Sequence, residues 1–92
     1  MSDENEIELP IDGELDLHLF HPRDVKDLVP DYLDECKQRG ITEVRIIHGK
    51  GTGALRETVH AILNKRNDVI EFYLTDHNWG STSLTLNLET DP

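Results

Sequence analysis

Val44-Arg45-Ile46-Ile47-His48-Gly49-Lys50-Gly51-Thr52-Gly53 stands in the middle of this 92-residue chain. Its apolar start predicts a strand over residues 43–47, and the apolar spacing that follows predicts a helix over residues 54–66. A loop of alternating glycines between a strand and a helix N-terminus brings backbone N–H groups close to a ligand, and the partial positive charge of the helix start favours an anion. Lys50 adds a full positive charge. We therefore expect a phosphate site, which points toward nucleotides or nucleic acid.

The glycine spacing also has a simpler interpretation. Glycines often mark only a tight turn with positive φ angles. The loop is not a P-loop, because Gly51 stands where Ser or Thr would follow Gly49-Lys50. It does not match the dinucleotide fingerprint G-x-G-x-x-G either, so a phosphate role needs support from elsewhere in the chain.

The rest of the chain alternates between strand and helix patterns. We expect strands over residues 14–19, 69–75 and 82–88, because apolar residues alternate with polar ones. Their predicted buried sets are Leu15, Leu17 and Leu19; Ile70, Phe72 and Leu74; and Leu84, Leu86 and Leu88. A first helix should run from Pro22 to Gly40. Pro30 could split it, but the apolar stripe stays in phase, which favours one kinked helix.

The element order strand, helix, strand, helix, strand, strand predicts an α/β fold, an α+β two-layer sandwich with a four-stranded mixed sheet. Strands separated by helices favour parallel pairing, and the last two strands should be antiparallel. One polar face on most strands argues for both helices on one face of the sheet. The open face would then carry Asp16, His18, Arg45, Glu71, Tyr73, Thr85 and Asn87.

The composition indicates one small domain with an acidic leader. The chain has 19 acidic residues against 9 Lys and Arg, a formal net charge of -10, and six of the acids lie in the first 14 residues. We expect residues 1–13 to form a disordered leader, residues 14–89 the folded domain and residues 90–92 a tail. A single cysteine, Cys36, on the buried stripe and the lack of signal-peptide or membrane-spanning features favour a soluble, cytoplasmic protein. The acidity suggests weak intrinsic affinity for nucleic acid, or delivery by a protein partner.

Asp16 and His18 are the candidate catalytic pair. Side chains two apart on a strand share a face, and parallel pairing would put this pair beside the glycine loop. A carboxylate and an imidazole beside a phosphate could act in general acid–base hydrolysis of a phosphodiester, or could hold a divalent metal such as magnesium or manganese. Both could equally be solvated polar residues. A zinc site of Asp16, His18, His21 and His48 is a further, unspecific alternative.

Other histidines and the tryptophan have less specific patterns. His21 should lie at the helix entry, His60 on the surface of the second helix, and His77 in a turn. Trp79 could stack on a base or pack over the sheet edge.

Taken together, Leu15-Asp16-Leu17-His18 and the stretch from Val44 to Gly53, followed by Leu55-Arg56, resemble the Smr (small MutS-related) domain family. The family pattern is L-D-L-H-G, then a strand ending in H-G-x-G-x-G, then a glycine-containing loop before a final strand, here Asn78-Trp79-Gly80-Ser81-Thr82. The resemblance spans about Leu15 to Leu88. Leu19 stands where the family usually has glycine, and Gly80 stands alone where glycine pairs are common.

The resemblance implies a fold like the C-terminal domain of translation initiation factor three, nucleic-acid binding and, in many members, nicking of DNA or cleavage of RNA. It implies cleavage for Asp16 and His18. It implies nucleic-acid contacts for His48, Gly49, Lys50, Gly51, Thr52, Gly53 and Arg56, and for Trp79 and Gly80 of the last loop. The expected partners are DNA or RNA, branched or structured, with a recruiting protein and no membrane. The alternatives are a non-catalytic nucleic-acid-binding module and a protein-interaction module that uses the open sheet face.

Overall fold

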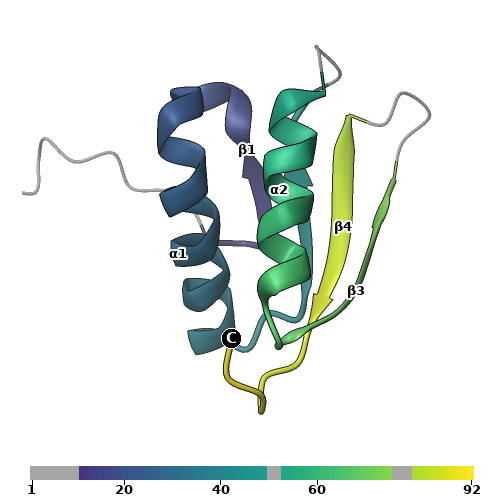
Figure 1. The fold of residues 1–92 in the computed structure, drawn as a ribbon. Coiled ribbons are helices and arrows are strands. Elements are labelled where there is room, and N and C mark those ends of the chain that lie inside the picture. The colour runs from purple at the N-terminus through teal and green to yellow at the C-terminus, as the bar shows by residue number, and fades with distance from the viewer. Residues whose placement is uncertain (1–10, 50–52, 76–79) are drawn as a thin grey trace, which may run out of the picture.

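The computed structural model describes residues 11–49, 53–75 and 80–92. Four strands, β1 (Glu14–Asp16), β2 (Glu43–Ile47), β3 (Val69–Leu74) and β4 (Ser81–Leu86), form one sheet in the order β1-β2-β4-β3. The helices α1 (Val25–Gln38) and α2 (Ala54–Lys65) lie together on one face of it (Figure 1). The 3-10 turns η2 (Leu17–Leu19) and η3 (Pro22–Asp24) link β1 to α1. The expected two-layer fold is confirmed.

Strand directions follow the predicted pattern. β1 pairs with β2 in parallel, which sets Asp16 opposite Ile47. β4 lies antiparallel to both β2 and β3. β2 and β3, which α2 connects, therefore run in the same direction with β4 between them. Because β1 and β2 are parallel, their carboxyl ends lie at the same end of the sheet, where the site is expected.

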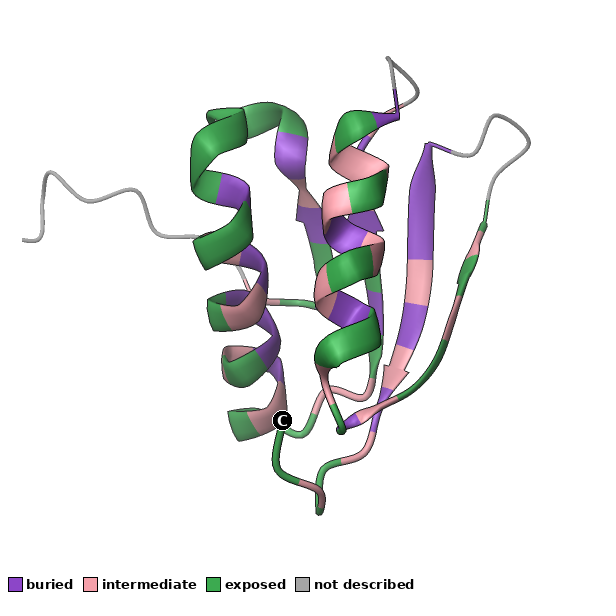
Figure 2. Cartoon of the chain, viewed as in Figure 1, coloured by how far each residue is buried: buried purple, intermediate pink, exposed green. Residues whose placement is uncertain are grey.

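The buried residues lie between the helices and the sheet, and Figure 2 shows them along the inner faces of both helices. The core contains the α1 stripe predicted from the sequence, and α1 continues through Pro30 as one helix. Gly40 ends this helix at φ +73. Its N–H donates to the Lys37 carbonyl, and the Ile41 N–H donates to the Cys36 carbonyl. This is the Schellman arrangement, which satisfies carbonyls that the helix end leaves open.

Three predicted strand positions are wrong. The first strand stops at Asp16, because the Asp16 carboxylate accepts the His18 N–H and turns the chain into η2, which leaves Leu19 75% exposed. Ile70 is 62% exposed, because the register between Val69 and Glu71 shifts and reverses the alternation. Leu88 is exposed because β4 ends two residues before it.

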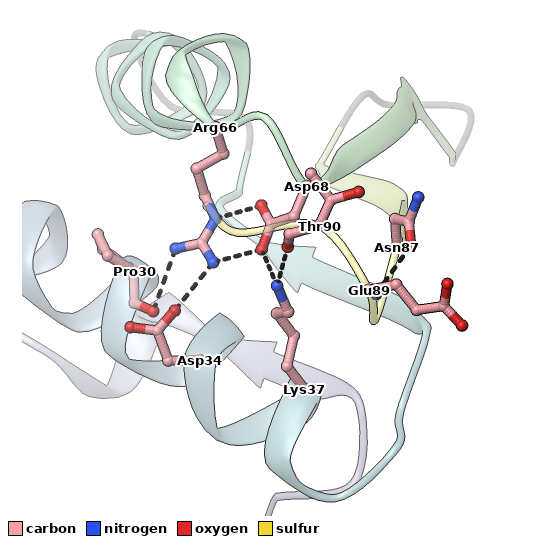
Figure 3. A network of polar contacts seen from close by, with 8 residues as sticks. All are labelled: Pro30, Asp34, Lys37, Arg66, Asp68, Asn87, Glu89 and Thr90. Atoms are coloured by element: carbon pink, nitrogen blue, oxygen red, sulfur yellow. Dashed lines mark hydrogen bonds and ion pairs between the residues drawn. The ribbon is translucent and has the colours of Figure 1, made fainter.

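A buried ion-pair network ties the two helices to the C-terminal segment (Figure 3). Asp68 is fully buried and accepts hydrogen bonds from Lys37 Nζ at 2.9 Å and from Arg66 Nε and Nη2 at 2.9 and 2.8 Å. Arg66 also binds Asp34, and Lys37 donates to the Thr90 carbonyl. Burial alone would raise the pKa of Asp68, but the hydrogen bonds from Arg66 and Lys37 outweigh it and lower that pKa. The network lies at the end of the molecule opposite the carboxyl ends of β1 and β2.

Candidate functional site

The two motifs singled out in the sequence meet at the carboxyl ends of β1 and β2. β1 ends at Asp16, which pairs with Ile47, and His48 and Gly49 follow directly. The expected convergence of the Asp-x-His motif with the start of the glycine loop is therefore present. It arises from parallel pairing of two strands that the first helix separates in sequence.

The Asp16 carboxylate orients the His18 ring. Asp16 Oδ1 accepts a hydrogen bond from the His18 backbone N–H and lies 2.9 Å from His18 Nδ1. A carboxylate oxygen only accepts, so the proton between them belongs to Nδ1. In the neutral imidazole Nε2 then carries the free lone pair. The His18 side chain is 60% exposed, and a carboxylate fixes the orientation of its ring, an arrangement suited to a general base.

The His18 ring lies directly against Gly49. A Cβ built on Gly49 would stand 2.7 Å from His18 Nε2, and Gly49 has φ +77. Real Cβ atoms do not approach a ring nitrogen this closely, and only glycine adopts this backbone conformation without strain. The backbone of Gly49 therefore favours glycine, and a larger residue there would displace the neighbouring imidazole.

Gly80 joins the last loop to the glycine loop. Its carbonyl accepts hydrogen bonds from the N–H groups of His48 and Gly49, both at 2.9 Å. The backbone amide of Gly49 is therefore engaged within the protein in this structure. Lys50, Gly51 and Thr52, to which the sequence also assigns phosphate contacts, lie outside the described residues, as do His77 and Trp79.

The Arg56 guanidinium lies close to Gly53, the residue that precedes α2. Gly53 precedes the helix with φ +88, and a Cβ on it would stand 2.9 Å from Arg56 Nη2. The guanidinium therefore adds positive charge at a helix N-terminus, where the backbone already favours an anion. A guanidinium can bind two phosphate oxygens at once.

His48 lies inside the protein, beneath α2. It is 4% exposed, its Nε2 lies 2.8 Å from Thr82 Oγ1, and its Nδ1 lies 3.1 Å from the Gly49 carbonyl oxygen. His60 Nε2 lies 2.8 Å from the same Thr82 hydroxyl, and the His60 ring packs on Phe72 at 4.9 Å. The expectation that His60 is a surface residue is wrong, because its position beside the apolar stripe turns it toward β4. Thr82 is part of the last-loop stretch quoted above, but its contacts with two histidines have no sequence signal.

The described residues do not assemble a metal site. No three His, Cys, Asp or Glu side chains gather within residues 11–49, 53–75 and 80–92. The zinc hypothesis is wrong for its four residues, because His48 is buried under α2 and His21 Nδ1 accepts the Arg23 N–H. Asp16 and His18 are only two candidate ligand residues, and they are hydrogen-bonded to each other. We therefore assign no chemical step to a metal ion.

The open sheet face is acidic. A shallow hollow of about 200 Å³ on it is lined by Asp12, Gly13, Glu14, Glu43, Val44, Arg45, Tyr73 and Ser83. Its one basic side chain, Arg45, is paired with Glu14 at 3.0 Å. This face therefore attracts a polyanion poorly. Across the part of the chain that the structure describes, no helix is long and apolar enough to cross a membrane.

Known proteins are similar to this chain in sequence and in fold. A family model described as the Smr domain matches residues 15–87. Endonuclease MutS2 of Geobacillus sp. is 40% identical over 73 residues, 79% of this chain and 9% of the relative. Endonuclease MutS2 of Acetivibrio thermocellus is 36% identical over 76 residues, 83% of this chain and 10% of the relative. The chain thus spans about a tenth of the length of these relatives.

Two solved structures superpose closely on the chain. The Smr domain of Thermus thermophilus MutS2 gives a TM-score of 0.75 at 29% identity, covering 83% of this chain and 99% of that one. YdaL, a stand-alone small MutS-related protein from Escherichia coli, gives 0.76 at 21% identity, covering 87% and 68%; this second likeness shows the fold alone. With the family match over residues 15–87 and the site geometry above, the chain belongs to the Smr domain family.

Proposed function

We propose that this domain binds DNA or RNA at the end of the sheet where β1 meets the glycine loop, and cleaves a phosphodiester bond there. The observation that carries the proposal is the His18 ring, oriented by Asp16 and seated against Gly49. Relatives with the same domain are named Endonuclease MutS2. The domain is about a tenth of their length, so the activity is proposed for this chain on its own site.

The chemistry needs a base, an oriented phosphate and a proton donor. His18 Nε2 takes a proton from the attacking water, whose oxygen forms a bond to phosphorus while the bond to the leaving oxygen breaks. The leaving oxygen departs on the opposite side of phosphorus and takes a proton from solvent, while the imidazolium releases its proton to solvent. Asp16 holds the ring and stabilises its positive charge, as the carboxylate does in hydrolase triads. Arg56 and the N-terminus of α2 stabilise the developing charge on the phosphate.

Lys50, Gly51 and Thr52 complete this scheme as phosphate ligands on sequence grounds, and Trp79 and Gly80 as contacts of the last loop. Gly53 allows the close approach of Arg56. His48 acts from behind the loop, because its ring is buried and bonded to Thr82. The site therefore contacts the ligand with the loop, His18 and Arg56.

The test measures cleavage and binding on the same proteins. His18→Gln and Asp16→Asn should each lower the rate at which a supercoiled plasmid is nicked or a labelled RNA is cleaved by about 10²-fold or more. Both should keep the affinity for the uncleaved oligonucleotide within a few fold. Asp31→Asn, on the exposed side of α1, is the matched control and should cleave normally. Undiminished cleavage by the His18 and Asp16 variants would contradict the catalytic assignment.

A binding module without cleavage is the second candidate. Leu19, at the position where the family usually has glycine, follows His18 directly and is 75% exposed. It lies in a right-handed 3-10 turn, so its backbone is unstrained, and the difference from glycine is the bulk of the side chain beside the ring. Under this alternative, salt-sensitive binding persists, while wild-type protein and the His18→Gln variant are equally inactive in cleavage.

A further inference from the structure

One hydroxyl bridges two histidines behind the glycine loop. Thr82 Oγ1 on β4 lies 2.8 Å from His48 Nε2, at the end of β2, and 2.8 Å from His60 Nε2 on α2. Thr82 is fully buried and His48 nearly so. The contact therefore links three elements, and no part of the proposed chemistry uses Thr82 or His60.

The directions of these hydrogen bonds can be worked out. The Gly49 carbonyl only accepts, so His48 Nδ1 carries a proton, and when the ring is neutral its Nε2 presents a lone pair. Thr82 must then donate its hydroxyl proton to His48 Nε2. The Thr82 oxygen in turn accepts from His60 Nε2–H. The bonds run in one direction, from His60 through Thr82 and His48 to the Gly49 carbonyl.

The charge states fit this arrangement. Burial lowers the pKa of His60, and His48 and Arg56 lower it further. His60 is therefore neutral at pH 7 with its one proton available to Thr82. Phe72 covers the ring from β3.

The chain of bonds ends at the residue on which His18 lies. Gly49 receives a hydrogen bond at its carbonyl from His48, and its own N–H donates to Gly80. Both groups of Gly49 are thus fixed, and its Cα faces the His18 ring. Since a shift of about 1 Å in a catalytic group can cost about 10²-fold in rate, what holds Gly49 also matters to His18.

We propose that Thr82 and His60 are positioning residues of the Asp16–His18 site: through His48 they fix Gly49, and through Gly49 the placement of the His18 imidazole. The proposal rests on the proposed function for its catalytic consequence. Its structural part concerns hydrogen bonds that can be observed without substrate.

The experiment compares Thr82→Val with Thr82→Ser. Valine keeps the shape of threonine and removes the hydroxyl, whereas serine keeps the hydroxyl. Imidazole ¹⁵N NMR of the free protein identifies which nitrogen of His48 carries the proton. In wild type and Thr82→Ser this is Nδ1. In Thr82→Val the proton stays on Nδ1, but Nε2 loses its hydrogen-bond donor, so the ¹⁵N resonance of Nε2 moves and the resonances of Gly49 and His18 shift with it.

Cleavage supplies the second measurement. Thr82→Val should lower kcat at least tenfold with KM little changed, and Thr82→Ser should restore most of it. His60→Phe removes the donor to Thr82 and keeps an aromatic ring on Phe72, so it should reproduce the effect in a folded protein if Thr82→Val fails to fold. If Thr82 and His60 acted only by packing, His60→Phe and Thr82→Ser would change kcat to the same extent.

The two proposals fail separately. A wild-type His48 with its proton on Nε2, or Gly49 and His18 resonances unchanged in both Thr82→Val and His60→Phe, overturns the positioning role whatever the activity. If instead the resonances shift as expected and the wild-type domain cleaves no DNA or RNA, the positioning of His18 stands and the nuclease assignment is overturned.

Discussion

Gly49→Ala should remove activity while costing little more stability than a matched glycine substitution elsewhere. Gly49 and Gly40 have nearly the same positive φ, +77 and +73. An alanine in this left-handed region is strained by about 1–2 kcal/mol. A Cβ on Gly40 meets nothing within 4 Å, whereas one on Gly49 would lie 2.7 Å from His18 Nε2. The pair therefore separates backbone strain from displacement of the imidazole.

The extra cost at Gly49 should be small in stability. The His18 ring is 60% exposed and can turn away from a new methyl group. It then loses its hydrogen bond to Asp16, and one such bond contributes about 0.5–1.5 kcal/mol. Gly40→Ala should thus lose about 1–2 kcal/mol, and Gly49→Ala about 1 kcal/mol more. Urea denaturation measures both, and the m-value should stay unchanged.

Cleavage should differ far more than stability between the two variants. Displacing His18 from Asp16 removes the oriented base, so Gly49→Ala should lose about 10²-fold or more in rate. Gly40→Ala should cleave like wild type at a temperature where both are folded. The reasoning is refuted if Gly49→Ala cleaves within twofold of Gly40→Ala, or if NMR still finds His18 Nδ1–H bonded to Asp16.

Three further outcomes follow from the described contacts. Asp68→Asn leaves two basic side chains buried with a weakened partner, so it should lower the free energy of unfolding by about 3–5 kcal/mol. Asp34 is a half-exposed partner in the same network, so Asp34→Asn should lower it by about 1 kcal/mol or less. Equal losses in denaturant unfolding would contradict the network. The pKa of His60 in the folded protein is below its ordinary 6.5, so the unfolded chain binds a proton first as pH drops. Stability should therefore fall as pH drops through about 6.5. A His60→Phe protein that shows the same fall would exclude His60 as the cause. Cys36 is fully buried, and burial raises the pKa of its thiol; a thiol reagent should therefore react with it only as fast as the domain opens, and rapid native labelling would refute this.

Local patterns account for most of the fold. The strand over 43–47 and the helix beginning at Ala54 match the structure, because the apolar spacing and the glycine-rich interruption predict the same element boundaries. Parallel pairing of the first two strands then brings Asp16 and His18 to the loop. That convergence follows from topology and needs no knowledge of side-chain contacts.

The misses share a physical cause, which is that distant contacts override local pattern. His60 is predicted on the surface of the second helix, yet its ring reaches Thr82, 22 positions away on β4. Ile70 fits an alternating strand, but a register shift against β4 turns it to solvent. No spacing within one segment signals any of these.

The most direct test of the central claim is an NMR titration of the labelled domain with a short single-stranded and a branched oligonucleotide, at low and moderate salt. Resonance shifts should gather on Asp16, His18, Gly49, Gly53 and Arg56 and should weaken as salt rises, because phosphate contacts release counterions. Glu43 and Glu71, on the acidic open face, should stay unchanged. Shifts centred on that face, or no shift at low salt, would contradict a nucleic-acid site at the end of the sheet.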